Sequence, residues 1–419
     1  MDRVDQRGFD NQRSELVSAK EAARYLGVRL ATLYSYASRG LVRSEPGPKG
    51  RGRRYQRADL ERLKQRSEAR SGHAPVAAGA LSWGEPVLET AVSAIREDGP
   101  SYRGVSAVKL ARDGVRFESA AELLFTGTLP DEPPEWSASG VASLVREVRR
   151  SVPPGPPLPT LLAAVPRLAL ADPDRHAAPV AADLDRGRRL IRTLVAILGL
   201  SRGEDAALAA AREPSIAGAT AIALGVSARK TRAALDRTLV LTADHELNAS
   251  TFAARVVAST GADVYACVTG ALAALSGPRH GAFSDRVEAL LDEVAVPERA
   301  AEVVAARTAR GEVVPGFGHP LYPAGDPRVA PMLEAALPLA GQNPRVKSLL
   351  AIIQAMERGR REPPNLDFGL VVVVHALGLP RGSGAALFAL GRTAGWIAHA
   401  LEQRETGRLL RPRATYVGK

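Results

Sequence analysis

The chain has very little cysteine and few aromatic residues. Among its 419 residues there is one cysteine, Cys267, and Phe, Trp and Tyr together make up 5%. A single thiol can form neither an internal disulfide nor a cysteine-based zinc site, so both are excluded and Cys267 is expected to be a packing residue. The apolar content of 45%, rich in Ala, Leu and Val, favours a helical globular protein.

The sequence also lacks long uncharged apolar runs. No stretch of eighteen or more residues has the character of a membrane span, and the N-terminal MDRVDQRGFDNQR is charged rather than apolar. We therefore expect no membrane partner and a cytoplasmic protein. The length suggests two or more domains, or one large core with an appendage.

Negative charge is scarce in the first part of the chain. The formal net charge is +11, and residues 1–70 hold 17 Lys and Arg against 9 Asp and Glu, so eight of the eleven excess positive charges lie there. A basic module on a nearly neutral body suggests a polyanionic partner, most simply nucleic acid.

Residues 14–70 carry the signals of a small helical module. Ser18 followed by Glu21 predicts a capping box that opens a helix ending at Gly27, and a second helix is predicted over 30–38. The next segment, EPGPKGRGRRYQ, predicts a basic β-hairpin, and Asp59 predicts the start of a third helix. The candidate DNA contacts are Arg29, Thr32, Ser35, Arg39, Arg51, Arg53 and Arg54.

This module resembles the winged helix-turn-helix of the MerR/excisionase type. The resemblance covers about fifty-five residues and implies DNA binding, with a dimeric body supplying two copies for paired half-sites. The alternative is a small basic helical module that binds a protein or nothing. Residues 71–80 are predicted to be a linker and residues 81–419 a second domain.

The second domain is predicted to be nearly all-α, because no alternating strand pattern persists in it. Residues 251–275 predict one buried helix or two, and residues 288–308 predict an amphipathic helical stretch. Residues 131–160 are rich in proline and are expected to cross the surface between helices.

Several polar residues of this domain stand in rigid or apolar contexts. His245 lies between two acids, His280 lies in GPRHG, and His319 lies in PGFGHPLYPAGDPR. Any one histidine alone is more often a structural residue than a functional one. A carboxylate in apolar surroundings, Asp367, suits a base for a weak carbon acid. The arginines that could grip a polycarboxylate are Arg328, Arg392 and Arg411.

Two other kinds of site fit less well. The three histidines could form a zinc set, but no pair has the i, i+4 spacing of a helix-borne site, so no metal is expected. The GFGH segment lacks the Lys-Ser/Thr ending of a phosphate-binding loop.

Six segments follow one another along this domain: DHELNAS, GPRHG, GFGHPLYPAGDPR, PNLDF, GRTAGWIAH and RPRATYVG. In order and spacing they resemble the motifs of the citrate synthase family. Two earlier segments, SYRG and ELLFTGTLP, resemble the early helices of that family. The resemblance covers about residues 95–418. It implies an almost entirely helical homodimer with a large domain and a small one, the latter at about 282–378. It also implies condensation of acetyl-CoA with oxaloacetate to give citrate and CoA, without a resident cofactor.

The resemblance further implies roles for individual residues. Asp367 would take a proton from the acetyl-CoA methyl group, His280 would stabilise the enolate, and His319 would polarise the oxaloacetate carbonyl. Oxaloacetate would be held by His245, Arg328 and Arg392, and by Arg411 from the other subunit.

Departures from the family pattern leave the substrate open. Thr242 stands where many members have histidine, GFGHPLY replaces GFGHRVY, and Gly369-Leu370 replaces Ser-Gly. A 2-methylcitrate synthase using propionyl-CoA, or a citryl-CoA-cleaving relative, would use the same residues. Arg360 and Arg361 are candidates for the CoA phosphates, or a solvated charge pair. A transcription regulator that uses the domain as a ligand sensor is the alternative from another class.

Overall fold

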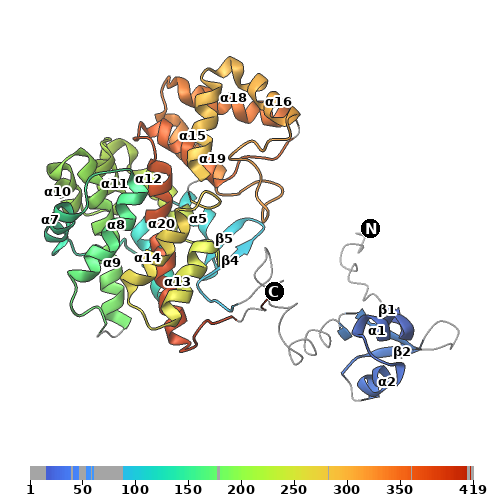
Figure 1. The fold of residues 1–419 in the computed structure, drawn as a ribbon. Coiled ribbons are helices and arrows are strands. Elements are labelled where there is room, and N and C mark those ends of the chain that lie inside the picture. Colours follow the sequence, from blue (N-terminus) through green and yellow to red (C-terminus); the bar gives the residue numbers. More distant parts are fainter. Residues whose placement is uncertain are drawn as a thin grey trace, which may run out of the picture. The chain divides into compact units, whose positions relative to one another are not determined.

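The computed structural model describes residues 16–38, 41–46, 53–57, 59–60, 88–176, 180–281, 283–359, 361–412 and 416. By their internal contacts these residues form two compact units. The first comprises the described residues up to Glu89 together with those from Arg411 onward, and the second comprises the described residues from Thr90 to Leu410. Figure 1 follows the chain through both units, which are described separately here.

The N-terminal unit contains two short helices and a three-stranded antiparallel sheet in the order β1-β3-β2. Its elements are β1 (Leu16–Ser18), α1 (Ala19–Leu26), α2 (Leu30–Ser38), β2 (Ser44–Pro46) and β3 (Arg53–Gln56). The predicted capping box is present, because the Ser18 hydroxyl accepts a hydrogen bond from the Glu21 N–H and the Glu21 carboxylate accepts one from the Ser18 N–H. Leu33 and Tyr55 are fully buried in its small core.

The predicted helix-turn-helix and β-hairpin are thus present in the N-terminal unit. Asp59 accepts two hydrogen bonds from the Arg43 guanidinium, of 2.9 and 3.1 Å. Arg39, Arg51, the predicted linker and most of the predicted third helix lie outside the described residues.

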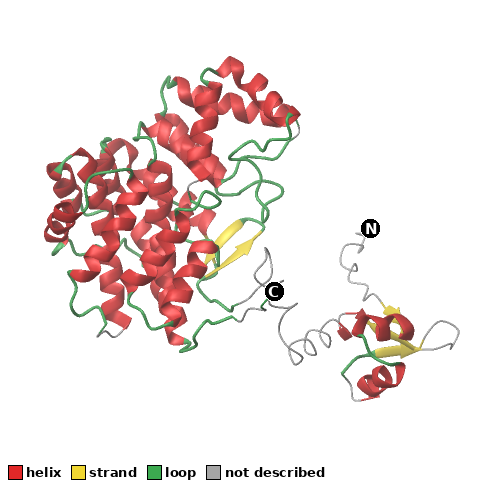
Figure 2. Cartoon of the chain, in the orientation of Figure 1, coloured by secondary structure: helices red, strands yellow, loops and turns green. Residues whose placement is uncertain are grey.

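The body is almost entirely helical, as Figure 2 shows. Its α-helices are α5 (Ala107–Arg112), α6 (Phe117–Thr126), α7 (Val141–Ser151), α8 (Pro157–Leu170), α9 (Val180–Leu198), α10 (Glu204–Arg212), α11 (Ile216–Leu224), α12 (Ala228–Thr242), α13 (Ala249–Ser259), α14 (Val264–Leu275), α15 (Phe283–Val294), α16 (Ala300–Ala309), α17 (Val329–Ala336), α18 (Pro344–Arg358), α19 (Leu366–Leu377) and α20 (Ser383–Glu405). Short 3₁₀ helices occur at η2 (Gly199–Arg202), η3 (Pro297–Arg299) and η4 (Leu337–Leu339).

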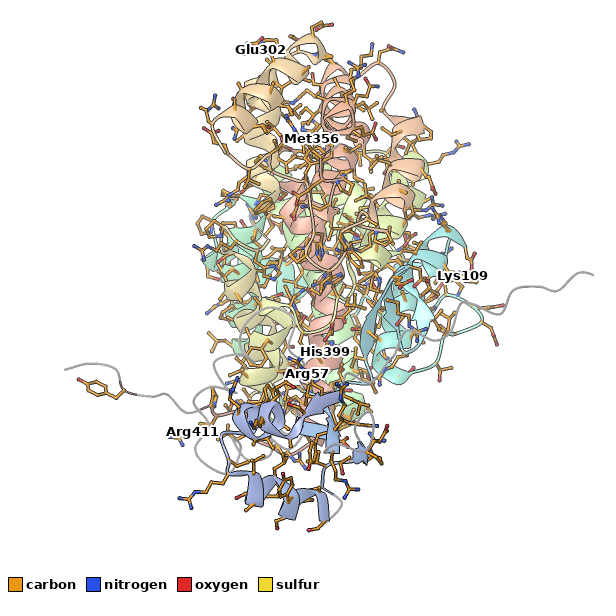
Figure 3. All side chains as sticks on the ribbon, turned by 90° about the vertical axis from the view of Figure 1, so that its right-hand side faces the viewer. Arg57, Lys109, Glu302, Met356, His399 and Arg411 are labelled. Atoms are coloured by element: carbon orange, nitrogen blue, oxygen red, sulfur yellow. The ribbon has the colours of Figure 1, made fainter. Side chains whose placement is uncertain are left out.

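The larger core of the body is built around α20, nearly all of whose side chains are buried. Helices α12, α13 and α14 pack along it, and α6, α8, α9, α15 and α19 also contact it (Figure 1). Figure 3 shows α20 running through the body, with His399 near its C-terminal end. Cys267 is fully buried and packs with Ala258 and Ala400, as expected for a packing residue.

A second, smaller hydrophobic cluster is formed by α15, α16, α18 and α19. Figure 3 labels two residues of this part, Glu302 on α16 and Met356 on α18. α19 contributes Phe368 to this cluster and Leu370 to the larger one, so one helix joins the two cores.

Three predictions about the body were wrong in detail. The stretch 288–308 is two helices, because Ala295 has a left-handed φ of 59° and Pro297 begins a 3₁₀ turn. The stretch 131–160 contains α7. A three-stranded sheet, β4 (Ser93–Arg96), β5 (Gly99–Tyr102) and β6 (Val105–Ser106), includes part of the SYRG segment that was expected to be helical. Strands of two to four residues are too short for an alternating pattern to be recognised.

Candidate active site

Arg392 and His245, two of the polar residues singled out from the sequence, come together because α20 lies close to the C-terminal end of α12. A Cβ atom at Gly395 would lie 2.2 Å from the Asp244 Oδ1 atom, and one at Gly391 would lie 2.1 Å from the Thr242 hydroxyl oxygen. Glycine at these two positions therefore permits the approach, which places Arg392 against the segment that carries His245.

Arg392 is completely buried, yet its guanidinium makes only one hydrogen bond within the protein. Its Nε donates a 2.8 Å hydrogen bond to the Thr242 carbonyl, whereas Nη1 and Nη2 have no hydrogen-bond partner. The guanidinium lies over the Phe388 ring, 4.6 Å from its centroid. Burial lowers the pKa of Arg392 to about 10. Two unpaired buried donors in a planar fork are suited to a bidentate carboxylate.

Arg328 is also buried but is already paired. It donates from Nε and Nη2 to the two oxygens of Asp326, at 2.8 and 2.7 Å, and Asp326 Oδ2 also accepts from the Leu366 N–H at 3.2 Å. This arrangement fixes Arg328 at the start of α17 and links its loop to the start of α19. Although burial opposes ionisation, Arg328 lowers the pKa of Asp326, so the pair is ionic.

His245 follows α12 and lies among cations. Its Nε2 is 3.0 Å from the Tyr322 hydroxyl, and its ring centroid is 5.6 Å from that of His319. Burial and the charges of Arg328 and Arg392 lower its pKa well below the usual value. His245 is therefore neutral at physiological pH.

The loop that carries His319 is fastened to the segment before Asp367. Gly318 N–H donates to the Pro363 carbonyl, Asn365 N–H donates to the Gly316 carbonyl, and the Asn365 side chain donates to the Gly318 carbonyl, at 2.9 to 3.0 Å. His319 Nδ1 accepts a 3.2 Å hydrogen bond from the Leu321 N–H. Neutral His319 therefore carries its proton on Nε2.

Asp367 occupies the first turn of α19, after the capping residue Asn365. Burial, aided by the nearby charge of Asp326 and opposed by Arg328, raises its pKa to about 7. A carboxylate with a pKa near neutrality can accept a proton from a weak carbon acid and later release it.

His280 follows α14, and its Nε2 is 2.8 Å from the Ser250 hydroxyl. Burial and the charge of Arg392 lower its pKa to about 4, so it is neutral. Ser250 also accepts from the Trp396 indole N–H and can donate to Asn248, at 3.2 and 2.9 Å. If Ser250 donates its proton to His280 instead, Nδ1 of His280 bears the hydrogen and becomes a donor.

The structure adds residues that sequence reasoning missed or did not assign. The buried carboxylate of Asp244 accepts hydrogen bonds from His399 Nε2 at 3.2 Å and from the Ser93 hydroxyl. Arg255 donates toward His399 Nδ1 at 3.5 Å, which assigns the His399 proton to Nε2. His399 stands in the quoted GRTAGWIAH motif, which was the available signal.

The remaining predicted residues lie elsewhere. Arg29, Arg53 and Arg54 are exposed on the N-terminal unit, while Thr32 and Ser35 are half-buried on α2. Arg411 is exposed and belongs by its contacts to the N-terminal unit, so its predicted role in a neighbouring subunit's site stays a prediction. Arg361 is half-buried, and its guanidinium donates to the Val304 carbonyl at 3.3 Å.

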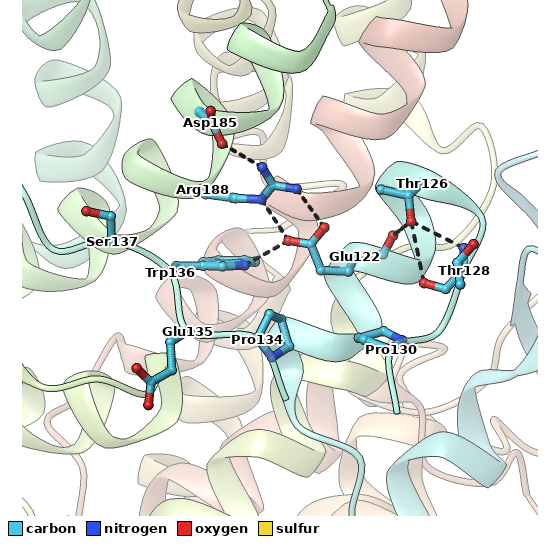
Figure 4. A pocket seen from close by; sticks show the side chains of 10 residues that line it. All are labelled: Glu122, Thr126, Thr128, Pro130, Pro134, Glu135, Trp136, Ser137, Asp185 and Arg188. Carbon is cyan, nitrogen blue, oxygen red and sulfur yellow. Dashed lines mark hydrogen bonds and ion pairs between the residues drawn. The ribbon is translucent and has the colours of Figure 1, made fainter. Parts of the chain in front are cut away.

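A cavity of about 570 Å³ lies apart from this group, between α6, α9 and the 127–137 loop (Figure 4). Its Glu122 carboxylate is already bound by both Arg188 and the Trp136 indole, at 2.7 and 2.8 Å.

In the described part of the chain, no cluster of three or more His, Cys, Asp or Glu residues could hold a metal ion. No helix among the described residues is long and apolar enough to cross a membrane.

Comparison with known proteins agrees with this arrangement. Residues 80–413 match the family described as "Citrate synthase, C-terminal domain", and residues 16–67 match a "Helix-turn-helix domain". "Citrate synthase 2" of Bacillus subtilis is 39% identical over 188 residues, which are 44% of this chain and 50% of that protein. The match to this and the other first relatives thus spans about half of their length. "2-methylcitrate synthase" of Mycobacterium tuberculosis is 32% identical over 359 residues, covering 80% of this chain and 89% of the relative.

Solved structures share the fold. The citrate synthase of Thermoplasma acidophilum, in a ternary complex with carboxymethyl coenzyme A and oxaloacetate, superposes with a TM-score of 0.69 at 26% identity, covering 80% of this chain and 94% of that one. The Pyrobaculum aerophilum enzyme gives 0.68 at 28% identity, covering 83% and 94%. Since the family match spans most of the chain and the same fold is observed, the protein belongs to the citrate synthase family, with a helix-turn-helix domain preceding the family domain.

Proposed function

We propose that the body condenses an acyl-CoA with oxaloacetate, and that acetyl-CoA and oxaloacetate give citrate and free CoA. Asp367 removes a proton from the methyl carbon of the thioester. His280, with its proton on Nδ1, donates a hydrogen bond to the thioester oxygen and stabilises the enolate. The reaction needs no resident cofactor, because base and hydrogen-bond donors are all side chains.

The second half of the reaction uses the other residues. His319 donates its Nε2 hydrogen to the oxaloacetate ketone oxygen while the enolate carbon attacks the ketone carbon, which forms citryl-CoA. Water then cleaves the thioester, and CoA leaves as the thiol. Arg392 binds a carboxylate of oxaloacetate through its two unpaired nitrogens, while Arg328 and His245 stand beside it.

This proposal rests on two features found together. The Asp367 carboxyl group has a pKa of about 7, and the two terminal nitrogens of the buried Arg392 have no hydrogen-bond partner. Neutral histidines complete the set, since each has a pKa below its usual value. A ligand sensor would need the arginine to bind a carboxylate, but it would have no use for a base whose pKa lies near neutrality.

The acyl group can be identified from the product. Purified protein is incubated with oxaloacetate and either acetyl-CoA or propionyl-CoA, and the acid formed is identified and quantified by mass spectrometry. Faster formation of citrate supports the acetyl-CoA reaction, whereas faster formation of 2-methylcitrate would assign propionyl-CoA. Absence of both acids would contradict the proposal.

We further propose that the N-terminal unit binds DNA. The exposed positions of Arg29, Arg53 and Arg54, around a capped helix-turn-helix, support contacts with phosphates. Two such units in a homodimer would reach paired half-sites, and the same dimer would let Arg411 complete the other subunit's site. Sedimentation of the full chain tests the dimer, and a monomer that turns over oxaloacetate would contradict the role of Arg411.

A further inference from the structure

Tyr322 is buried among three groups that the proposed function assigns to oxaloacetate. Its exposed fraction is 4%. Its ring centroid lies 5.6 Å from that of His245 and 4.9 Å from that of His319, and the Arg328 guanidinium carbon lies 5.8 Å from it. Tyr322 is therefore a common neighbour of two imidazoles and a guanidinium.

The backbone around Tyr322 is fixed. Its N–H donates to the His319 carbonyl, and its own carbonyl accepts from the Gly325 N–H, each at 3.0 Å. The turn thus orients the side chain toward His245, whose Nε2 lies 3.0 Å from the tyrosyl hydroxyl oxygen. Burial raises the pKa of Tyr322 to about 12, so its hydroxyl keeps its proton.

The hydrogen bond between these two side chains has two possible directions. If Tyr322 donates to His245 Nε2, the tyrosyl oxygen turns only lone pairs toward the site. If His245 donates from Nε2, the tyrosyl hydrogen is free to donate to a third group. An anionic ligand favours the second direction, because donors stabilise negative charge and lone pairs repel it.

On the basis of the proposed function, we propose that Tyr322 is a further oxaloacetate-binding residue, whose hydroxyl donates a hydrogen bond to the keto acid while His245 Nε2–H holds the tyrosyl oxygen. The three predicted ligands Arg328, Arg392 and Arg411 supply charge. Tyr322 and His245 supply a neutral, directional donor, which selects the position of the substrate oxygen.

The Tyr322→Phe variant tests this proposal, because phenylalanine keeps the ring and removes the hydroxyl. Loss of one hydrogen bond to a charged acceptor is expected to raise the Kd of oxaloacetate, measured by calorimetry without acyl-CoA, about 10- to 100-fold. The KM of the acyl-CoA should change less than about twofold. An unchanged oxaloacetate Kd in folded Tyr322→Phe overturns the proposal.

A matched control is Tyr265→Phe. Tyr265 is 3% exposed, and its hydroxyl donates a 2.9 Å hydrogen bond to Asp172, outside the candidate site. The control should lose heat stability without a change in oxaloacetate affinity. Equal weakening in both variants would assign Tyr322 a merely structural role.

Two further outcomes separate this proposal from the proposed function. If the wild-type protein itself fails to bind oxaloacetate, the proposed function fails. If Tyr322→Phe does not fold, ¹⁵N NMR of histidine-labelled wild-type protein decides, with the His245→Gln variant identifying the signal. The expected result is a protonated Nε2 on His245 when oxaloacetate is present, and an unprotonated Nε2 overturns the proposal.

Discussion

The Thr242 main-chain carbonyl accepts a hydrogen bond from Arg392 Nε, and both terminal nitrogens of Arg392 have no hydrogen-bond partner in the protein. The bond does not involve the Thr242 side chain, whose hydroxyl donates within α12 to the Thr238 carbonyl at 2.9 Å. Threonine replaces the family's histidine at this position, but the main-chain hydrogen bond to Arg392 is therefore kept. The threonine side chain lies against Gly391, where the two helices meet.

Replacing Arg392 with lysine tests whether the Arg392 guanidinium binds a carboxylate of oxaloacetate through two hydrogen bonds. Lysine keeps the charge but cannot form two parallel hydrogen bonds to one carboxylate. We expect the Kd of oxaloacetate, measured by calorimetry, to rise about 10- to 100-fold in Arg392→Lys. Arg112→Lys, at an exposed ion pair with Glu334, is the control and should bind as the wild type does. Wild-type affinity in Arg392→Lys would mean that the fork does not hold the ligand.

The raised pKa of Asp367 has a consequence for stability. Its folded-state pKa of about 7 exceeds the ordinary value of 3.8, so the folded state resists ionisation and loses stability as pH rises between these values. Asp367→Asn removes this cost, and we expect it to raise the free energy of unfolding at pH 8 by about 2–4 kcal/mol.

Chemical denaturation at pH 4 and pH 8 checks this expectation. At pH 4 the carboxyl group is largely protonated in the folded state, so the gain from Asp367→Asn should be small. The control Asp113→Asn, at an exposed pair with Lys109, should change stability little at either pH. A variant that is equally stabilised at both pH values would refute a raised pKa at Asp367.

Gly395→Ala tests the close packing of α20 on the 242–245 segment. The added methyl group would lie 2.2 Å from an oxygen of the buried Asp244 side chain and 2.5 Å from the Ala243 main-chain oxygen, so the helix must move. We expect a loss of about 1–3 kcal/mol in unfolding free energy and weaker oxaloacetate binding, because Arg392 moves with the helix. Gly155→Ala, whose nearest neighbour would lie 3.5 Å away, is the control. Unchanged stability and affinity would show that the contact does not position Arg392.

The basic hairpin of the N-terminal unit should contribute phosphate contacts. Arg53 and Arg54 are exposed on β3, so replacing both with alanine should weaken DNA binding to all sequences to a similar extent. The slope of log K against log salt should fall by about 1 per lost contact. Gel-shift titrations at several salt concentrations measure this. A double variant with wild-type affinity and slope would exclude these arginines from the interface.

Much of the fold follows from local signals. The capping box at Ser18 and the apolar run over residues 251–275, which forms α13 and α14, act within a few residues, so the sequence displays them. The hydrogen bond between Tyr322 and His245 joins residues 77 positions apart, and the bond between His399 and Asp244 joins residues 155 positions apart. Such pairings depend on how the helices pack against one another. The spacing of apolar residues along the sequence does not encode that packing. The break at Ala295 was missed because a left-handed alanine has no sequence signal comparable to glycine.

The most direct test of the account is release of free CoA from acetyl-CoA and oxaloacetate, followed with a thiol reagent from pH 5 to pH 9. The account predicts turnover on the order of 1 per second or more for the folded wild-type protein. The rate should rise with pH through about 7 as Asp367 ionises, and should be lost in Asp367→Asn. Thiol release by folded Asp367→Asn at the wild-type rate, or none from folded wild-type protein with either acyl-CoA, would contradict it.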